Sequence, residues 1–206
     1  MIRVFIETNF LINISFKQEE YKSSYKLLKL AEKNKIKLCL PSLCISEAYW
    51  VFAKENKAQL DTKKAINDLI NKALRSSHSR RDFENYRQIS TDIDKKLDKE
   101  LKMLDRNINR VLKIVELIKH NTTVHRNGII YRSKFDIKHE PDAFIVSAVV
   151  WYKTNKMPPT SHGLFVTADS GLVNEPKIMQ LMHKKKIELK SSFKESVETL
   201  KSKGVS

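Results

Sequence analysis

The residues of this sequence best placed to do chemistry are four carboxylic acids: Glu7, Glu47, Asp142 and Asp169. Glu7 directly follows the apolar run 2–6, and Asp169 comes two residues after the apolar run 163–167. Both runs are typical of buried strands. Parallel sheets bind ligands at the carboxyl ends of their strands, so we expect these two side chains at one edge of a sheet.

Glu47 and Asp142 are expected on helices that begin near the same edge. Glu47 lies one to two turns into the helix that follows the apolar run 36–40. Asp142 lies in the first turn of a helix predicted over 141–153, most of which is apolar. Each acid taken alone has an ordinary explanation, such as the helix dipole or a solvated helix face. The joint pattern is what indicates a site.

A cluster of carboxylates predicts a bound cation, because like charges repel unless a positive charge separates them. Oxygen ligands of this kind suit Mg²⁺ or Mn²⁺. Such ions promote phosphodiester hydrolysis by activating water and by stabilising the leaving oxygen. We therefore predict a phosphodiester hydrolase in which Asp142, Asp169 and Glu7 hold one or two of these ions. Glu47 completes the shell or orients the attacking water.

The composition is strongly basic, with 39 Lys and Arg against 24 Asp and Glu and a formal net charge of +15. This excess favours binding to nucleic-acid phosphates, although Lys-rich solvated helix faces give the same count. No apolar run reaches the roughly 18 residues of a membrane span. Cys39 and Cys44 have no partner cluster for zinc or for a disulfide framework. A cytoplasmic protein that does not bind membranes is therefore expected.

The order of the elements predicts an α/β fold, because strands that alternate with helices are typical of a parallel sheet. Thr8 or Asn9 is expected to cap a helix that begins near Phe10, and Asn127-Gly128 is expected to form a turn. Strands are predicted over 2–6, 36–40, 163–167 and 187–189, and further helices over 19–34, from Ser42, and over 141–153, 177–183 and 192–202.

The middle of the chain predicts a helical hairpin, with residues 58–75 packed against residues 82–120. In the second helix, apolar residues repeat with alternating spacings of four and three, as in a coiled coil. This seam consists of Leu97, Leu101, Leu104, Ile108, Val111, Val115 and Ile118. Packing within the chain is favoured over a homodimer, because an amphipathic partner helix lies next in the sequence.

The hairpin is predicted as an insertion of about 57–126 in a single domain over 1–206, whose core is about 1–56 and 127–206. The hairpin itself, residues 58–120, contains six of the nine arginines of the chain: Arg75, Arg80, Arg81, Arg87, Arg106 and Arg110. Arginine makes bidentate contacts with phosphate, so these side chains are candidates for holding an RNA backbone. The alternative is a solvated helical surface with ion pairs, for example Asp98 with Lys102.

Four segments resemble the sequence motifs of PIN domains, in the same order and with similar spacing. The resemblance covers about residues 1–56 and 127–200, and each motif alone is weak. The segments are Phe5-Ile6-Glu7-Thr8-Asn9-Phe10-Leu11-Ile12, Pro41-Ser42-Leu43-Cys44-Ile45-Ser46-Glu47, Glu140-Pro141-Asp142-Ala143-Phe144-Ile145-Val146-Ser147-Ala148 and Phe165-Val166-Thr167-Ala168-Asp169-Ser170-Gly171-Leu172.

The resemblance implies a three-layer α/β/α sandwich with a central parallel sheet, and a Mg²⁺- or Mn²⁺-dependent ribonuclease activity. Many small PIN proteins are toxins of the VapC type, which an antitoxin holds inactive. The resemblance also implies site roles. Glu7, Glu47, Asp142 and Asp169 match the metal-binding carboxylates, Asn9 matches the residue that supports the first of them, and Thr167 matches the hydroxyl residue beside the last.

The sequence departs from the family pattern at Glu7, where an aspartate is usual, and in the long insertion. The longer side chain moves the carboxylate, and Mg²⁺ tolerates little geometric error. Two other functions therefore stay open beside the ribonuclease. One is a catalytically silent PIN-like scaffold that binds RNA or a partner protein, and the other is a DNA-directed or structure-specific nuclease. The expected partners are RNA, an acidic antitoxin and, through the seam, a second copy of the chain.

Overall fold

A five-stranded sheet with all neighbouring strands parallel forms the centre of the molecule, in the order β3-β2-β1-β4-β5. The computed structural model describes residues 1–73 and 84–205. The strands are β1 (Ile2–Phe5), β2 (Ile36–Pro41), β3 (Glu116–Ile118), β4 (Gly163–Val166) and β5 (Ile187–Lys190). Four of the five lie where the apolar runs predict them.

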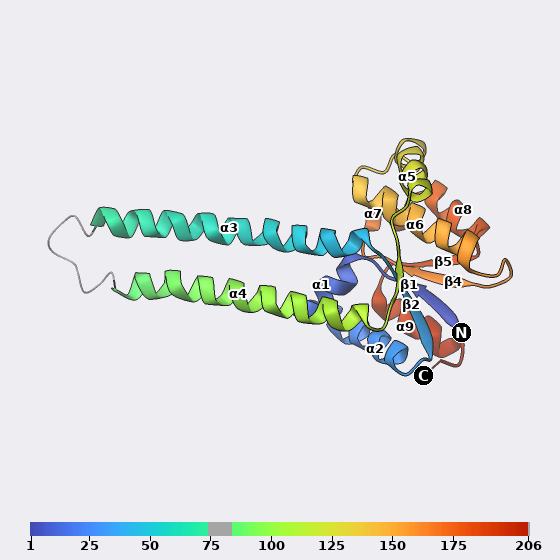
Figure 1. The fold of residues 1–206 in the computed structure, drawn as a ribbon, viewed down its shortest axis with the longest axis horizontal. Helices are drawn as coiled ribbons and strands as arrows, with labels where there is room; N and C mark the ends of the chain where they lie inside the picture. The colour runs from blue at the N-terminus through green and yellow to red at the C-terminus, as the bar shows by residue number, and fades with distance from the viewer. Residues whose placement is uncertain (74–83, 206) are drawn as a thin grey trace.

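Helices cover both faces of this sheet, which confirms the predicted three-layer sandwich (Figure 1). Helices α6 and α8 pack on one face, and α2 and α9 pack on the other. None of the described helices is long and apolar enough to cross a membrane. The helices are α1 (Thr8–Phe16), α2 (Tyr21–Glu32), α3 (Leu43–Ala73), α4 (Glu84–Leu112), α5 (Thr122–Lys134), α6 (Glu140–Lys156), α7 (Ser170–Val173), α8 (Pro176–Lys184) and α9 (Phe193–Ser202).

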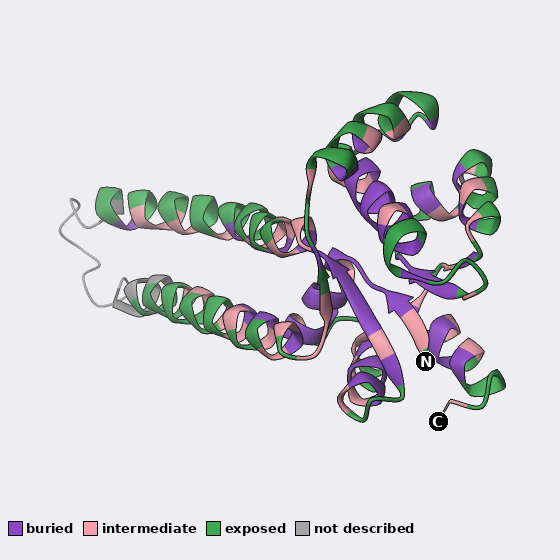
Figure 2. Ribbon diagram, turned by 45° about the vertical axis from the view of Figure 1, so that its right-hand side comes forward, coloured by how far each residue is buried: buried purple, intermediate pink, exposed green. Residues whose placement is uncertain are grey.

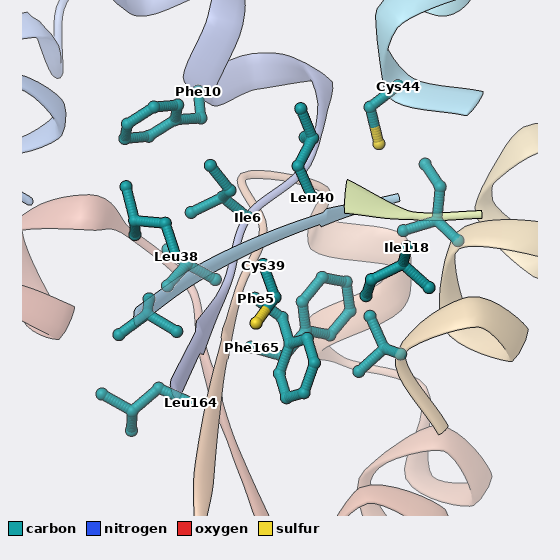
Figure 3. Close-up of a cluster of buried hydrophobic side chains, with 14 of the residues drawn as sticks. Phe5, Ile6, Phe10, Leu38, Cys39, Leu40, Cys44, Ile118, Leu164 and Phe165 are labelled. Carbon is teal, nitrogen blue, oxygen red and sulfur yellow. The ribbon is translucent and has the colours of Figure 1, made fainter. Parts of the chain in front are cut away.

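The three central strands are buried on both faces, and this is why they are almost continuously apolar. Successive residues of β2 point to opposite faces, with Leu38 and Leu40 on one side and Cys39 on the other (Figure 3). Phe5 and Phe165 are completely buried beside Cys39. These contacts fix the carboxyl ends of β1 and β4 in a rigid core.

The longest helices, α3 and α4, form an antiparallel hairpin that projects from the sandwich (Figure 1). Tyr49 donates to Asp105 with an oxygen–oxygen distance of 2.7 Å, and Lys63 forms an ion pair with Asp94 farther out. Most described residues on the outer sides of the hairpin are exposed (Figure 2). At the base, Leu104 and Ile108 of α4 are buried, and α4 packs on α1. The pairing is within the chain, as the sequence favours.

The structure changes three predicted boundaries of the hairpin. The helix predicted from Ser42 and the helix predicted over 58–75 are one continuous helix, α3. Helix α4 ends at Leu112 rather than near residue 120. The last two seam residues, Val115 and Ile118, lie beyond it, and Ile118 is the buried end of the edge strand β3. Part of the predicted insertion therefore belongs to the sheet.

The predicted turn at Asn127-Gly128 is wrong, because both residues lie inside α5. Gly128 is required there by close packing rather than by a turn. A Cβ atom on Gly128 would lie 2.1 Å from Cδ1 of Phe144, so only glycine allows α5 to approach α6 this closely.

Gly128→Ala is expected to lower the free energy of unfolding, because its methyl group overlaps the Phe144 ring. Overpacking costs about 1–3 kcal/mol, and the better helix propensity of alanine offsets at most about 1 kcal/mol. Chemical denaturation measures the difference. Ile129→Ala is the matched control, since Ile129 is the next residue and is exposed. A Gly128→Ala variant as stable as the wild type would contradict this packing.

Candidate functional site

The candidate site lies where the direction of strand addition reverses. The chain adds β2 and β3 on one side of β1, then returns to place β4 on the other side of β1. Ligands of open parallel sheets bind outside the carboxyl ends of the strands at such a point. Glu7 follows β1 by two residues, and Thr167 and Asp169 follow β4. The acids predicted from these strands therefore lie at the expected edge.

Glu7 is buried, with 6% of its surface exposed, and it caps helix α1. Its Oε2 accepts a hydrogen bond from the backbone N–H of Asn9 at 2.8 Å, and its Oε1 lies 3.5 Å from the backbone nitrogen of Ala168. The expected cap, Thr8 or Asn9, is therefore wrong by one or two residues. Glu7 has the extended backbone of a cap, and its longer side chain reaches the amide of Asn9.

Burial raises the pKa of Glu7 from 4.5 to about 7. The hydrogen bonds from Asn9 and Ala168 favour the ionised form, but they offset only part of this effect. The nearby carboxylate of Glu47 raises the pKa of Glu7 further. Glu7 is thus a buried acid that is costly to ionise in the absence of a nearby cation.

Glu47 connects α3 to the start of α1. The hydroxyl of Thr8 donates to Oε2 of Glu47. Burial raises the pKa of Glu47, while the hydrogen bond from Thr8 and the charge of His139 act in the opposite direction. The sequence did not single out Thr8 as a site residue. The sequence feature that could have identified Thr8 is its place between Glu7 and Asn9 in the first motif.

Asp142 and Asp169 come from α6 and from the turn after β4, and their side chains interact. Burial raises the pKa of Asp142 from 3.8 to about 7, and the charges of Asp169 and Glu47 contribute to this shift. Asp169 caps α7, with its Oδ1 accepting from the N–H groups of Gly171 at 2.6 Å and Leu172 at 3.2 Å. The backbone N–H of Asp169 donates to the hydroxyl of Thr167 at 3.0 Å.

The four acids form a connected electrostatic cluster. Glu47 acts on Glu7 and Asp142, and Asp169 acts on Glu47 and Asp142. An oxygen-only set of this kind suits a hard divalent cation, which would relieve the repulsion. Within residues 1–73 and 84–205, no group of three or more His, Cys, Asp or Glu side chains is already arranged to hold a metal ion. The chemistry of the donors nevertheless fits such an ion.

A pocket of about 330 Å³ opens beside this cluster, and Asp142 and Asp169 are part of its wall. Lys138 and His139, both exposed, also line it and place basic groups next to the acids. Glu175 lies on the same wall. Neither Lys138 nor Glu175 is among the site residues that the sequence predicts. Lys138 lies close to Asp142 in sequence, whereas nothing in the sequence pattern distinguishes Glu175.

Of the six predicted arginines, the two whose side chains the structure describes, Arg106 and Arg110, do not line the acidic pocket. Arg110 is bound to Glu32 of α2, with nitrogen–oxygen distances of 3.0 and 2.7 Å, and it lies over the ring of Tyr25. Arg106 is exposed on α4, and Arg87 also lies on α4. The other three, Arg75, Arg80 and Arg81, lie outside the described residues.

Fold and site together define an α/β/α protein with an acidic cluster at the switch point of a parallel sheet. A family model described as PIN domain matches residues 4–171, a span that includes all four acids. The chain therefore belongs to the PIN domain family. PIN domains are generally nucleases, and the predicted class of activity agrees with this membership.

A solved structure shows the same fold. It is the crystal structure of VapBC2 from Rickettsia felis bound to a DNA fragment from their promoter, with a TM-score of 0.50 and 14% sequence identity. The match covers 92% of this chain and 98% of that chain. At this identity the similarity establishes the fold alone. None of the curated proteins compared with the chain matches it.

The raised pKa of Glu7 predicts how stability depends on pH in the absence of divalent metal. Between about pH 4.5 and 7, the unfolded chain ionises Glu7 while the folded chain keeps its proton, so stability falls as pH rises. The difference between 4.5 and about 7 corresponds to roughly 3 kcal/mol.

Glu7→Gln is therefore expected to be about as stable as the wild type at pH 4 and more stable at pH 8, when both are unfolded with urea in EDTA. Glu198→Gln is the control, because Glu198 is an exposed glutamate on α9. Parallel pH profiles of the wild type and Glu7→Gln would show that Glu7 ionises freely in the folded chain.

Proposed function

We propose that this protein is a metal-dependent endoribonuclease of the toxin type. The observation that supports this most directly is the convergence of Glu7, Glu47, Asp142 and Asp169 outside the carboxyl ends of β1 and β4. Three of these four acids have a raised pKa, because Glu7 is buried, Glu47 and Asp142 are half-buried, and the acids lie close to one another. A structural role would not require several acids to share so unfavourable an environment.

In this proposal Glu7, Asp142 and Asp169 hold one or two Mg²⁺ or Mn²⁺ ions, and Glu47 completes the set. When bound, such an ion stabilises negative charge on the phosphate and makes water more acidic. The protein keeps the ligands in place through groups already described. The amides of Asn9 and Ala168 hold Glu7, Thr8 orients Glu47, and the start of α7 orients Asp169.

Basic side chains are available to bind the RNA backbone at two places. Lys138 and His139 lie on the wall of the acidic pocket, where a substrate phosphate would enter. On α4, basic residues recur every three or four positions, which places them on one side of the helix. Those that line a groove on this side are Lys95, Lys99, Lys102 and Arg106. Arg110 is not included in this surface, because it is bound to Glu32.

An acidic antitoxin is the proposed protein partner. The neighbour from Rickettsia felis was solved as VapBC2 with a DNA fragment from their promoter. The net charge of +15 on the present chain favours an acidic partner, because opposite charges accelerate and orient association.

The decisive test is a cleavage assay on single-stranded RNA, transfer RNA and single-stranded DNA, with Mn²⁺, Mg²⁺ or EDTA. Asp142→Asn is expected to lower the rate by about a hundredfold or more, because it removes a charged ligand with little change in shape. Glu140→Gln is the matched control. It lies in the same first turn of α6 and pairs with Arg132 at the surface.

The outcomes separate the competing functions. Metal-dependent cleavage of RNA that Asp142→Asn abolishes supports the proposal. Cleavage of DNA alone would identify a DNA-directed nuclease. No cleavage of any of the three polymers with either metal would favour a catalytically silent scaffold.

Metal binding is tested separately from cleavage by thermal unfolding. A ligand that binds only the folded state at a hundred times its dissociation constant stabilises it by about 2.7 kcal/mol. Saturating Mn²⁺ is therefore expected to raise the melting temperature of the wild type and of Glu140→Gln by several degrees. Asp142→Asn combined with Asp169→Asn should lose this shift. An equal shift in all three proteins would place the ion elsewhere.

A further inference from the structure

A second pocket, of about 230 Å³, lies near the amino-terminal ends of β4 and β5, whereas the acids lie at the carboxyl ends of the strands. It is bounded by the end of α6, the loop before β4 and the end of α8 just before β5. Helix α6 has Asp142 in its first turn and Lys153 eleven residues later, which separates them by roughly 16 Å along the helix. The two pockets are therefore distinct.

Four lysines line this second pocket, which we call the lysine pocket: Lys153, Lys184, Lys185 and Lys186. Three of them are consecutive in sequence, and a short basic run of this kind is usually a solvated surface. The fold adds the fourth, Lys153, from a distant part of the chain. None of the lining residues is acidic, and within the described parts of the chain none of the four lysines has an ion pair with a carboxylate.

Lys153 is the residue that distinguishes this pocket from an ordinary basic surface. Only 4% of its surface is exposed, although lysine is rarely buried without a counter-charge. Its ammonium group donates to the backbone carbonyl of Pro158 at 3.1 Å. An ammonium has three hydrogens to donate, and this contact uses one of them. Burial lowers the pKa of Lys153, and the charges of Lys186 and Lys185 lower it further.

The dipoles of the adjoining helices explain only part of this arrangement. Basic residues stabilise the carboxyl ends of helices, and both α6 and α8 end at the pocket. Each helix end is equivalent to about half a negative charge, whereas four lysines contribute four positive charges. About three positive charges remain uncompensated. An exposed lysine would satisfy the dipole without the cost of burying Lys153.

Polar groups with hydrogen-bonding capacity are also present. Lys185 donates to the hydroxyl of Thr154 at 3.2 Å, and Thr154 lines the pocket. The hydroxyl hydrogen of Thr154 can then point toward a ligand. Several ammonium groups with a hydroxyl beside them form a set of donors that suits a tetrahedral oxyanion with more than one negative charge.

We propose that the lysine pocket binds a phosphate group. Two sources have this chemistry, the terminal phosphate of an RNA chain and the phosphate of a free nucleotide. The site goes beyond the proposed nuclease function and is independent of it, since it contains none of the four acids and requires no divalent metal. Bound phosphate offsets part of this positive charge and accepts hydrogen bonds from the Lys153 ammonium.

The test is calorimetric titration of the full chain with pyrophosphate in EDTA, at constant ionic strength set by chloride. Lys153→Gln is expected to weaken pyrophosphate binding by about tenfold or more. Lys186→Asn provides a second variant in case the buried substitution prevents folding. Lys186 is exposed and has a positive φ of 56°, which asparagine tolerates. Lys201→Gln, at an exposed lysine of α9, is the control for loss of charge alone.

Binding that weakens in Lys153→Gln and Lys186→Asn but not in Lys201→Gln supports the proposal.

Competition with pyrophosphate then identifies the source of the bound phosphate. Displacement by a short 5′-phosphorylated RNA, but not by the same RNA without its terminal phosphate, indicates an RNA end. Displacement by adenosine monophosphate but by neither RNA indicates a free nucleotide. Absence of pyrophosphate binding at millimolar concentration, or an equal loss in Lys201→Gln, would overturn the proposal. Neither result depends on whether the protein cleaves RNA.

Discussion

Phe5 of β1 stands beside Phe165 of β4 in a parallel register, and the geometry of the acidic cluster depends on this pairing. Each strand ends within one residue of that pair, so Glu7 and Thr167 leave the sheet at the same level. Both phenylalanines are completely buried, which leaves the register little freedom to slip. A slip by one residue would turn the side chains of β1 to the opposite face and separate Glu7 from the loop that contains Asp169.

The fixed register of β1 and β4 also holds the four carboxylic acids close together, although their proximity costs free energy. Burying carboxylates near one another costs free energy, because each loses water and faces another negative charge. Backbone amides limit this cost. Glu7 and Asp169 both accept from the first amides of a helix, where the helix dipole also favours negative charge. Two of the acids therefore cap helices as well as belonging to the cluster, which explains why they follow strands so closely.

Much of the fold and the cluster was predictable from the sequence, because buried strands are continuous apolar runs and the acids follow them. Strand β3 was not predictable in this way. It has three residues, only Ile118 is buried, and the apolar spacing of α4 continues into it. The sequence predicts a turn at Gly128 because glycine is typical of turns, whereas the structure places Gly128 inside α5 against the ring of Phe144, a contact that the local sequence does not reveal. The support of Glu47 by Thr8 and the burial of Lys153 depend on contacts between distant segments, which sequence spacing does not contain.

The projecting hairpin also determines how the molecule behaves in solution. Helix α3 has 31 residues and is therefore about 46 Å long, more than the diameter of a compact small domain. A chain of 206 residues packed into a sphere-like domain has a radius of gyration of about 17 Å. The α3–α4 arm gives the single chain a larger radius and slower, anisotropic tumbling (Figure 1). A monomer of this shape will elute from a sizing column earlier than a compact protein of the same mass, so elution volume alone overstates the mass of the chain.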